Sequence, residues 1–316
     1  MPTLQQFRYL VAVADTRHFR RAAESVHVTQ PTLSVQLREL EEKLGIQLVE
    51  RSRAGVTLTP LGTEVAARAR AVLRDVADIA ALARAGADPL TGTVRVGVVG
   101  SLGSYFLPLV IPGLHEIYPT LKFYVREGTS RDLLGRLRDG TLDVLFFPLP
   151  VEEPSLTVAP LFHEPLLVVM PADHALAASA EVPRESLAGE TVMTLEAGHR
   201  LHDTVADLCA ETGARLSLDY EGTSLDTLRQ MVATGLGLSV LPALYVRSEV
   251  AREALVTARA LSAPAPGRDI GMVWRRRAGQ GAAYGELAGA IRKVLRRVAP
   301  EVMVCDRMAE TVEKRP

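Results

Sequence analysis

Small hydrogen-bonding side chains cluster at the start of one predicted helix near the N-terminus. They are Thr29, Gln30, Thr32 and Ser34, and Pro31 lies among them. Thr29 or Gln30 suits a helix start, and Pro31 suits the first turn, where one backbone N–H has no partner in any case. Hydroxyl and amide groups at the tip of a helix can enter the major groove of DNA and form hydrogen bonds with base edges. The chemistry predicted here is recognition by hydrogen bonding.

The remainder of this helix, to residue 44, has an apolar face and a polar face. Its leucines follow spacings of 4, 3 and 4, which predict the buried face: Leu33, Leu37, Leu40 and Leu44. Val35 and Arg38 lie opposite, so we assign them to the DNA-contacting set. The residues from Arg21 onward predict a shorter helix before a tight turn, which completes a helix-turn-helix. The alternative is an ordinary amphipathic helix, and the flanking sequence decides between the two.

Two arginines follow within residues 51–58, a stretch that predicts two short strands around a glycine turn. From such a wing Arg51 and Arg53 can bind phosphates or reach into a minor groove. The alternative is solvated surface charge. The positions of these arginines matter because the net charge of the chain does not indicate DNA binding. Residues 1–60 hold 8 Lys and Arg against 6 Asp and Glu, and the whole chain has a net charge of −1.

Hydroxyl side chains also stand at two predicted strand-to-helix junctions further along the chain. Ser101, next to Leu102, follows a strand predicted at 93–99, and Thr129 follows a strand predicted at 121–126. Ligands of open α/β sheets bind at the carboxyl ends of strands, where helix N-termini provide free N–H groups. We therefore expect a small polar or anionic ligand there. Helix capping remains the alternative role of each hydroxyl.

The elements that position these groups change in type near residue 90. Pro60 opens a long predicted helix to about Ala87, and its apolar residues recur every 3 or 4 positions: Leu61, Val65, Ala69, Val72, Val76 and Ile79. That pattern predicts a helix with a partner helix, or one packed on its own chain. After the helix-breaking residues 86–92, strands and helices alternate, which predicts a parallel sheet with helices on both faces.

Length and composition limit the class of protein. A chain of 316 residues with 47% hydrophobic and 23% charged residues predicts two or more globular domains. No apolar run of about 20 residues and no charged leader occurs, so we expect a cytoplasmic protein without membrane contact. Two cysteines and seven scattered histidines give no metal-ligand spacing. Neither a GxGxxG fingerprint nor a nucleophile–base pair occurs, so we predict no metal, no cofactor and no enzymatic activity.

The first 60 residues resemble the winged helix-turn-helix of LysR-type transcriptional regulators. The matching segments are residues 4–14, the Ala22–Ala23 pair, residues 29–34 and 40–45, the wing at 48–53, and residues 58–62. The resemblance implies a linker helix from residue 60 that dimerises and places two DNA-binding modules on one duplex. It also implies a C-terminal α/β effector domain with two lobes, like periplasmic binding proteins, in which the chain crosses between lobes near residues 164 and 267.

The C-terminal part is similar to the OxyR-type peroxide sensors, with one break. Residues 194–209 resemble their redox loop, and residues 222–228 and 231–237 resemble the second-lobe segment that lines the cleft. In those sensors a peroxide-reactive cysteine follows Gly-His directly, and a second cysteine lies nine residues later. Here Cys209 matches the second cysteine, but Arg200 stands at the first position. The resemblance implies an effector pocket without the two-cysteine switch, formed by Ser101, Leu102, Thr129, His199, Arg200, Thr223 and Ser224.

Cys209 leaves two hypotheses open. On a helix predicted from about residue 201 it falls beside Val205 and Leu208, where a buried thiol has a raised pKa and little reactivity. The other hypothesis is a one-cysteine peroxide sensor, in which oxidation of Cys209 to a sulfenic acid shifts the domain. Arg200 either favours an anion in the pocket or pairs with an acid of the chain, and the candidate acids are Glu127, Glu196 and Asp203.

The predicted organisation is a DNA-binding domain at 1–59, a linker helix and hinge at 60–90, an effector domain at 91–300 and a polar tail at 301–316. Lobe one comprises 91–163 and 267–298, and lobe two comprises 164–266. The predicted function is an OxyR-like, LysR-type transcription regulator, an activator in oxidative stress, that binds double-stranded promoter DNA as a homodimer or homotetramer. Further expected partners are RNA polymerase and a small-molecule or anionic effector. The alternative from another class is a solute-binding or enzymatic α/β protein.

Overall fold

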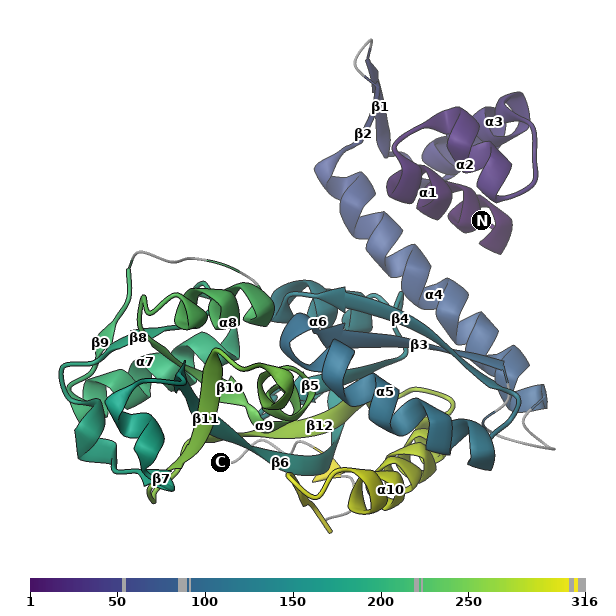
Figure 1. Cartoon of the computed structure of the whole chain (residues 1–316). Coiled ribbons are helices and arrows are strands. Elements are labelled where there is room, and N and C mark those ends of the chain that lie inside the picture. Colours follow the sequence, from purple (N-terminus) through teal and green to yellow (C-terminus); the bar gives the residue numbers. More distant parts are fainter. Residues whose placement is uncertain are drawn as a thin grey trace. The chain divides into compact units, whose positions relative to one another are not determined.

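The structure, a computed structural model, describes residues 1–52, 55–84, 90, 92–218, 222, 224–306 and 310–311. The chain divides into two compact units: Met1–Ala87 with Arg138–Thr141, and Asp88–Leu137 with Leu142–Pro316 (Figure 1). None of the helices within the described ranges combines the length and the apolar character that a membrane span requires.

The first unit consists of helices and one small hairpin. Its helices are α1 (Leu4–Thr16), α2 (Phe19–Ser25), α3 (Gln30–Leu44) and α4 (Pro60–Arg84), and the antiparallel hairpin is formed by β1 (Val49–Ser52) and β2 (Gly55–Leu58). The predicted leucine face of α3 is confirmed, because Leu33, Leu37 and Leu40 are buried in the core of this unit. Thr29 is the N-cap of α3, and its Oγ1 accepts a hydrogen bond from the Thr32 N–H at 3.4 Å.

The apolar residues of the predicted α4 seam differ in exposure within this unit. Ala66 and Ala69 are buried, and α4 packs on α1. By contrast, three members of the predicted seam are 52, 42 and 65% exposed: Leu61, Val72 and Ile79. At about 100° per residue, the six predicted residues lie within about 80° of arc on one face of α4. Ala69 is at the edge of that face next to the buried Ala66, and the side with Leu61, Val72 and Ile79 is open to solvent in this unit.

Lobe one of the second unit begins with the predicted alternation of strands and helices. Its elements are, in order, β3 (Gly92–Val99), α5 (Gly100–Ile117), β4 (Leu121–Gly128), α6 (Ser130–Arg138) and β5 (Val144–Pro148). β3 pairs in parallel with both β4 and β5. α10 (Gly281–Val298) returns to this lobe and packs against α5, and both helices contribute to the apolar core of the lobe.

Lobe two has a second apolar core. Its helices are α7 (Arg200–Thr212), α8 (Leu225–Ala233) and α9 (Ala243–Ser248), with short 3-10 helices η1 (Ala175–Ala178), η2 (Arg184–Leu187) and η3 (Val250–Arg252). Its strands are β7 (Glu181–Val182), β8 (Thr191–Met193), β9 (Arg215–Leu216), β10 (Leu238–Pro242) and β11 (Val256–Leu261). β8 pairs in parallel with β10 on one side and with β9 on the other.

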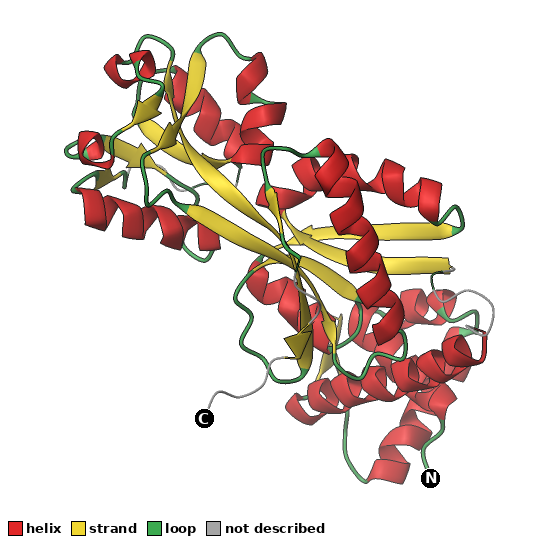
Figure 2. Ribbon diagram, turned by 90° about the horizontal axis from the view of Figure 1, so that it is seen from below, coloured by secondary structure: helices red, strands yellow, loops and turns green. Residues whose placement is uncertain are grey.

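Long antiparallel strands connect the two lobes (Figure 2). β6 (Leu156–Pro171) pairs with β12 (Gly267–Arg275) as far as Pro165, and from Leu166 onward it pairs with β10 and β11. β12 also pairs with β5. Part of the predicted tail lies in the same sheet, because β13 (Met303–Val304) and β14 (Glu310–Thr311) pair with β6.

A glycine in the first strand of lobe one tests the packing of this core. A Cβ at Gly97 would lie 2.5 Å from Leu145 Cδ2 and 2.6 Å from Leu142 Cδ1, and both leucines are fully buried. We expect Gly97→Ala to lower the free energy of unfolding by about 1–3 kcal/mol, the usual cost of overpacking a core. The fluorescence of Trp274, which lies in the same core, reports its unfolding in urea.

Gly285→Ala is the matched control, because a Cβ at this position in α10 would have nothing within 4 Å. A glycine in a helix interior is less stable than alanine, so this variant should gain about 0.5–1 kcal/mol. Equal stability of Gly97→Ala and the parent protein would contradict the packing around β3.

Candidate DNA-contacting face and effector cavity

The outward face of α3 carries most of the side chains predicted to contact DNA. Exposed residues on it are Gln30, Pro31, Thr32 and Arg38, together with Val35, which is 52% exposed although it is apolar. Ser34 is only partly exposed. The Thr29 hydroxyl is already engaged at the helix start, where its Oγ1 lies 2.8 Å from Thr32 Oγ1. α3 thus presents an exposed strip that begins at a helix N-terminus, a geometry that fits the major groove.

The hairpin after α3 is held to that helix by a carboxylate that no sequence pattern singles out. Glu41 Oε1 accepts hydrogen bonds from the backbone N–H groups of Leu48 (2.7 Å) and Val49 (3.0 Å). The backbone of Arg51 belongs to β1, but the Arg51 side chain and the whole of Arg53 lie outside the described residues. Their assignment to phosphate or minor-groove contacts stays a prediction.

A cavity of about 260 Å³ lies between the two lobes of the second unit. Lobe one contributes residues at strand ends and helix starts, lobe two contributes one face of α7, and β12 contributes its first residues. The lining side chains that carry hydrogen-bonding or charged groups are Ser101, Ser130, His199, Arg200, Asp203, Thr204, Asp207, Arg268 and Asp269.

A buried arginine holds Ser101, which lines the cavity from the first turn of α5. Arg268 donates from Nη1 to Ser101 Oγ and from Nη2 to the Ser101 carbonyl oxygen, both at 2.9 Å. Its Nε donates to Glu164 Oε2 at 2.8 Å, and Glu164 Oε1 accepts from the Leu244 N–H at 2.9 Å. Because Ser101 Oγ accepts from Arg268, its own O–H can still donate to a ligand. Sequence patterns predicted neither Glu164 nor Arg268.

Three residues that were predicted to form the pocket do not line this cavity: Leu102, Thr129 and Ser224. Thr129 is exposed and caps α6, since its Oγ1 accepts from the Asp132 N–H at 3.3 Å, and Ser130 lines the cavity instead. The reason is that β4 extends to Gly128, two residues beyond the predicted end of the strand. Leu102 is fully buried in the core of lobe one. Ser224 caps α8 by accepting from the Thr227 N–H at 3.4 Å, and Thr223 lies outside the described residues.

His199 and Arg200 line the cavity at the start of α7. The His199 Nε2 atom is buried, lies 3.8 Å from Glu196 Oε1 and has no hydrogen-bond partner among the described residues. Arg200 Nη1 donates to the Pro150 carbonyl oxygen at 2.8 Å, a contact from lobe two to lobe one. Within the described ranges Arg200 forms no ion pair with the three acids considered from the sequence.

The cavity carries charges of both signs. Asp203 and Asp207 follow Arg200 on the same face of α7, at the spacings that bring helix side chains together. Asp269 adds a third carboxylate, and its Oδ1 lies 2.8 Å from His163 Nδ1. Arg200 alone therefore does not specify an anionic ligand, because acceptors as well as donors surround the same space.

Cys209 lies on α7 as well, on the opposite side from Arg200. The two positions differ by nine in residue number, so on this helix they are about 13.5 Å apart along the axis and about 180° apart around it. Cys209 is 3% exposed in the core of lobe two, and burial raises the pKa of its thiol. This environment favours the hypothesis of an unreactive thiol. Since a disulfide needs Cα atoms within about 7 Å, an intact α7 also prevents a bridge between these two positions.

A thiol at position 200 tests the rigidity of α7. In a protein that also carries Cys305→Ser, we expect Arg200→Cys to form a sulfenic acid during a brief peroxide pulse, without a bridge to Cys209. The physical reason is that α7 must unwind before the two sulfur atoms meet. Peptide mapping under non-reducing conditions measures the bridge.

The control is the same variant oxidised in urea, where unfolding removes the separation and the bridge should form. A rapid and complete bridge in the native protein would show that the start of α7 rearranges easily. That result would contradict the assigned role of the helix.

Known proteins are similar to this chain along both units. Residues 4–63 match the bacterial regulatory helix-turn-helix protein, lysR family, and residues 87–296 match the LysR substrate binding domain. The DNA-binding transcriptional dual regulator OxyR of Escherichia coli strain K12 is 41% identical over 289 residues, which cover 92% of this chain and 94% of the relative. A probable hydrogen peroxide-inducible genes activator of Streptomyces viridosporus is 38% identical over 296 residues, covering 93% and 95%.

Solved structures agree with these relatives. A full-length OxyR cysteine-to-aspartate variant from Pseudomonas aeruginosa has a TM-score of 0.81 at 38% identity, covering 97% of this chain and 98% of that chain. A Corynebacterium glutamicum OxyR cysteine-to-serine mutant with bound H2O2 has a TM-score of 0.65 at 30% identity, covering 94% of each chain. Fold and sequence together show that the chain belongs to the LysR family of transcriptional regulators and is OxyR-like along nearly its whole length.

Proposed function

We propose that this regulator binds promoter DNA sequence-specifically as a homo-oligomer and responds to a small molecule in the cavity between its lobes. The observation that carries the proposal is the exposed face of α3. Val35 and Arg38 stand on this face beyond a polar helix N-terminus. An apolar side chain suits a thymine methyl group, and a guanidinium suits the acceptor pair of a guanine edge. In this proposal the chain reads duplex DNA and does not catalyse a reaction.

The exposed strip of α4 supports assembly into dimers. Leu61, Val72 and Ile79 are spaced by 11 and 7 residues, so they recur on one face of the helix. Burial of this strip against the same strip of a second copy would remove apolar surface from water and pair two α3 helices for one binding site. We extend the proposal to a tetramer, to a contact with RNA polymerase and, because promoter DNA is the target, to a cytoplasmic location.

Arg200 supports an input other than a two-cysteine switch. A guanidinium stays charged at physiological pH and has no thiol chemistry, so peroxide has no nucleophile at this position. A ligand that accepts the hydrogen bond of Arg200 Nη1 in place of the Pro150 carbonyl oxygen would break one contact between the lobes. The alternative is a one-cysteine sensor that acts through Cys209. Burial of that thiol and its raised pKa disfavour this alternative.

Arg38→Ala tests whether α3 reads bases. Loss of a base contact costs about 1–3 kcal/mol at one base position, so binding to a selected duplex should weaken while binding to a scrambled duplex changes little. The selected duplex is enriched from a random-sequence pool with the parent protein, and fluorescence anisotropy measures both affinities. Arg20→Ala is the control, because it removes the same charge from an exposed position on α2 and should affect both duplexes alike. An equal loss on both duplexes with Arg38→Ala would remove its assigned role.

Val72→Glu tests the dimer. Its carboxylate would be buried against its symmetry mate without a partner, which is strongly unfavourable. We expect a shift from dimer to monomer in sedimentation and a loss of tight binding to the selected duplex. Ala67→Glu adds the same charge on a different, exposed face of α4 and should leave the dimer intact. A Val72→Glu protein that sediments as a dimer and binds DNA normally would rule out this interface.

A further inference from the structure

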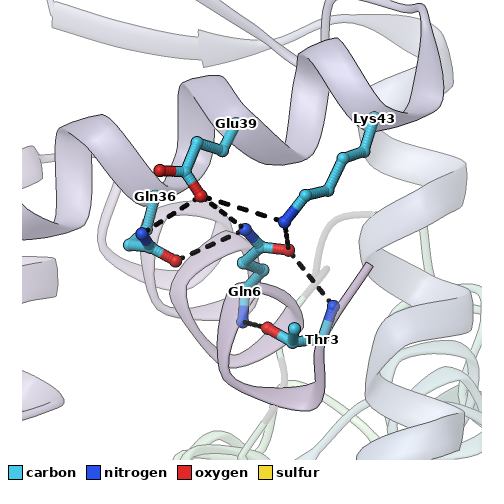
Figure 3. Close-up of polar contacts among 5 residues, drawn as sticks. All are labelled: Thr3, Gln6, Gln36, Glu39 and Lys43. Atoms are coloured by element: carbon cyan, nitrogen blue, oxygen red, sulfur yellow. Dashed lines mark hydrogen bonds and ion pairs between the residues drawn. The ribbon is translucent and has the colours of Figure 1, made fainter. Parts of the chain in front are cut away.

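A buried glutamine joins α1 to one flank of α3 (Figure 3). Gln6 Nε2 donates to Gln36 Oε1 at 3.3 Å and to Glu39 Oε2 at 3.2 Å. Gln6 Oε1 accepts from the Thr3 N–H at 3.1 Å and from Lys43 Nζ at 3.2 Å. A primary amide has two N–H donors and two acceptor lone pairs, so Gln6 uses its full hydrogen-bonding capacity in these contacts.

The α3 partners of Gln6 form one flank of that helix. Gln36, Glu39 and Lys43 are also linked to one another, since Gln36 Nε2 donates to Glu39 Oε2 at 3.2 Å and Lys43 Nζ lies 3.8 Å from the same oxygen. At about 100° per residue, this flank lies roughly a quarter turn from the buried leucines. It lies roughly a quarter turn, in the other direction, from the exposed strip with Val35 and Arg38.

The opposite flank of α3 has a polar contact as well. Glu41 lies roughly half a turn from the Gln6 flank, and there it accepts the two backbone hydrogen bonds of the hairpin. Leucine packing covers the side between the two flanks. Burial of apolar surface has no preferred direction, whereas hydrogen bonds weaken when their geometry is distorted. The two polar flanks therefore oppose rotation of α3 about its own axis.

We propose that Gln6 is a positioning residue for base recognition, because it fixes the rotation of α3 and so the direction of Val35 and Arg38. The inference rests on the proposed function of α3. A rotation of about 10° displaces an atom at the helix surface by roughly 1 Å, for a helix radius of about 5–6 Å. Base contacts need donor–acceptor distances of about 2.7–3.2 Å, so they do not tolerate that displacement. Phosphate attraction carries no sequence information and tolerates it better.

Gln6→Glu tests the proposal in the full-length chain. The new side chain keeps its size and an acceptor for Thr3 and Lys43, but it loses both donors and places a carboxylate against Glu39. We expect the ratio of affinities for the selected and scrambled duplexes to fall about tenfold, on the scale of one mismatched base pair. Gln5→Glu is the matched control, because it makes the same charge change at the exposed neighbouring position. Affinity for the scrambled duplex should be the same in both variants within about twofold.

A double variant that exchanges the amide and the carboxylate distinguishes a positioning role of Gln6 from a general loss of folding. In Gln6→Glu combined with Glu39→Gln, the new amide at position 39 can donate to the new carboxylate at position 6, and the net charge is unchanged. This double variant should restore the affinity ratio, and circular dichroism reports folding of every variant. If Gln6→Glu is unfolded, recovery of both fold and ratio in the double variant still supports the proposal.

Two results would overturn the proposal. One is a Gln6→Glu protein that loses affinity for both duplexes in the same proportion. The other is a folded double variant that does not recover the ratio. If the parent protein enriches no sequence from the random pool, the proposed function itself fails, and the positioning role fails with it before any variant is compared.

Discussion

The arrangement of the two lobes depends on a buried ion pair between Glu164 on β6 and Arg268 on β12. The two residues are paired in register where the strands cross, and their side chains are 0 and 8% exposed. Through them, Ser101 at the start of α5 in lobe one is connected to Leu244 at the start of α9 in lobe two. A buried pair of this kind adds little net stability, but loss of one partner leaves an uncompensated charge at a cost of about 3–5 kcal/mol. We interpret the pair as a device that specifies geometry.

The polar groups around the cavity differ in how far they are already hydrogen-bonded. Arg268 is already bound to both Ser101 and Glu164, so a ligand that draws Arg268 away leaves Glu164 without its partner. On the side of α7, by contrast, the buried His199 Nε2 has no hydrogen-bond partner within the described residues. An unpaired buried polar atom costs about 1–3 kcal/mol, so a ligand that completes its hydrogen bonding gains most there. Arg200 stands next to it and has further N–H donors beyond the one that binds Pro150.

Apolar periodicity identifies the face of a helix that leaves water, but it does not identify what covers that face. The leucine spacing of α3 identified the face that is buried within the unit, whereas the seam of α4 with Leu61, Val72 and Ile79 is exposed in this chain, so its burial against a second copy stays a prediction. Of the residues that the family resemblance assigned to a pocket, Ser101, His199 and Arg200 line the cavity between the lobes. Thr129 caps α6 and Ser130 lines the cavity, because the end of β4 depends on strand pairing, which local sequence does not determine.

Sequence reasoning did not predict the buried polar contacts of the fold and of the candidate sites. Glu164 and Arg268 are 104 positions apart, and charged residues are usually exposed, so nothing local suggests a buried pair. Gln6 and Glu41 resemble ordinary surface residues of amphipathic helices, yet each holds one flank of α3. Such contacts are directional, and discrimination between DNA sequences depends on the direction of base contacts, which charge alone does not provide. Apolar cores stabilise both units without direction, so we assign to the few directional polar contacts the orientation of the candidate DNA-contacting strip and of the cavity wall.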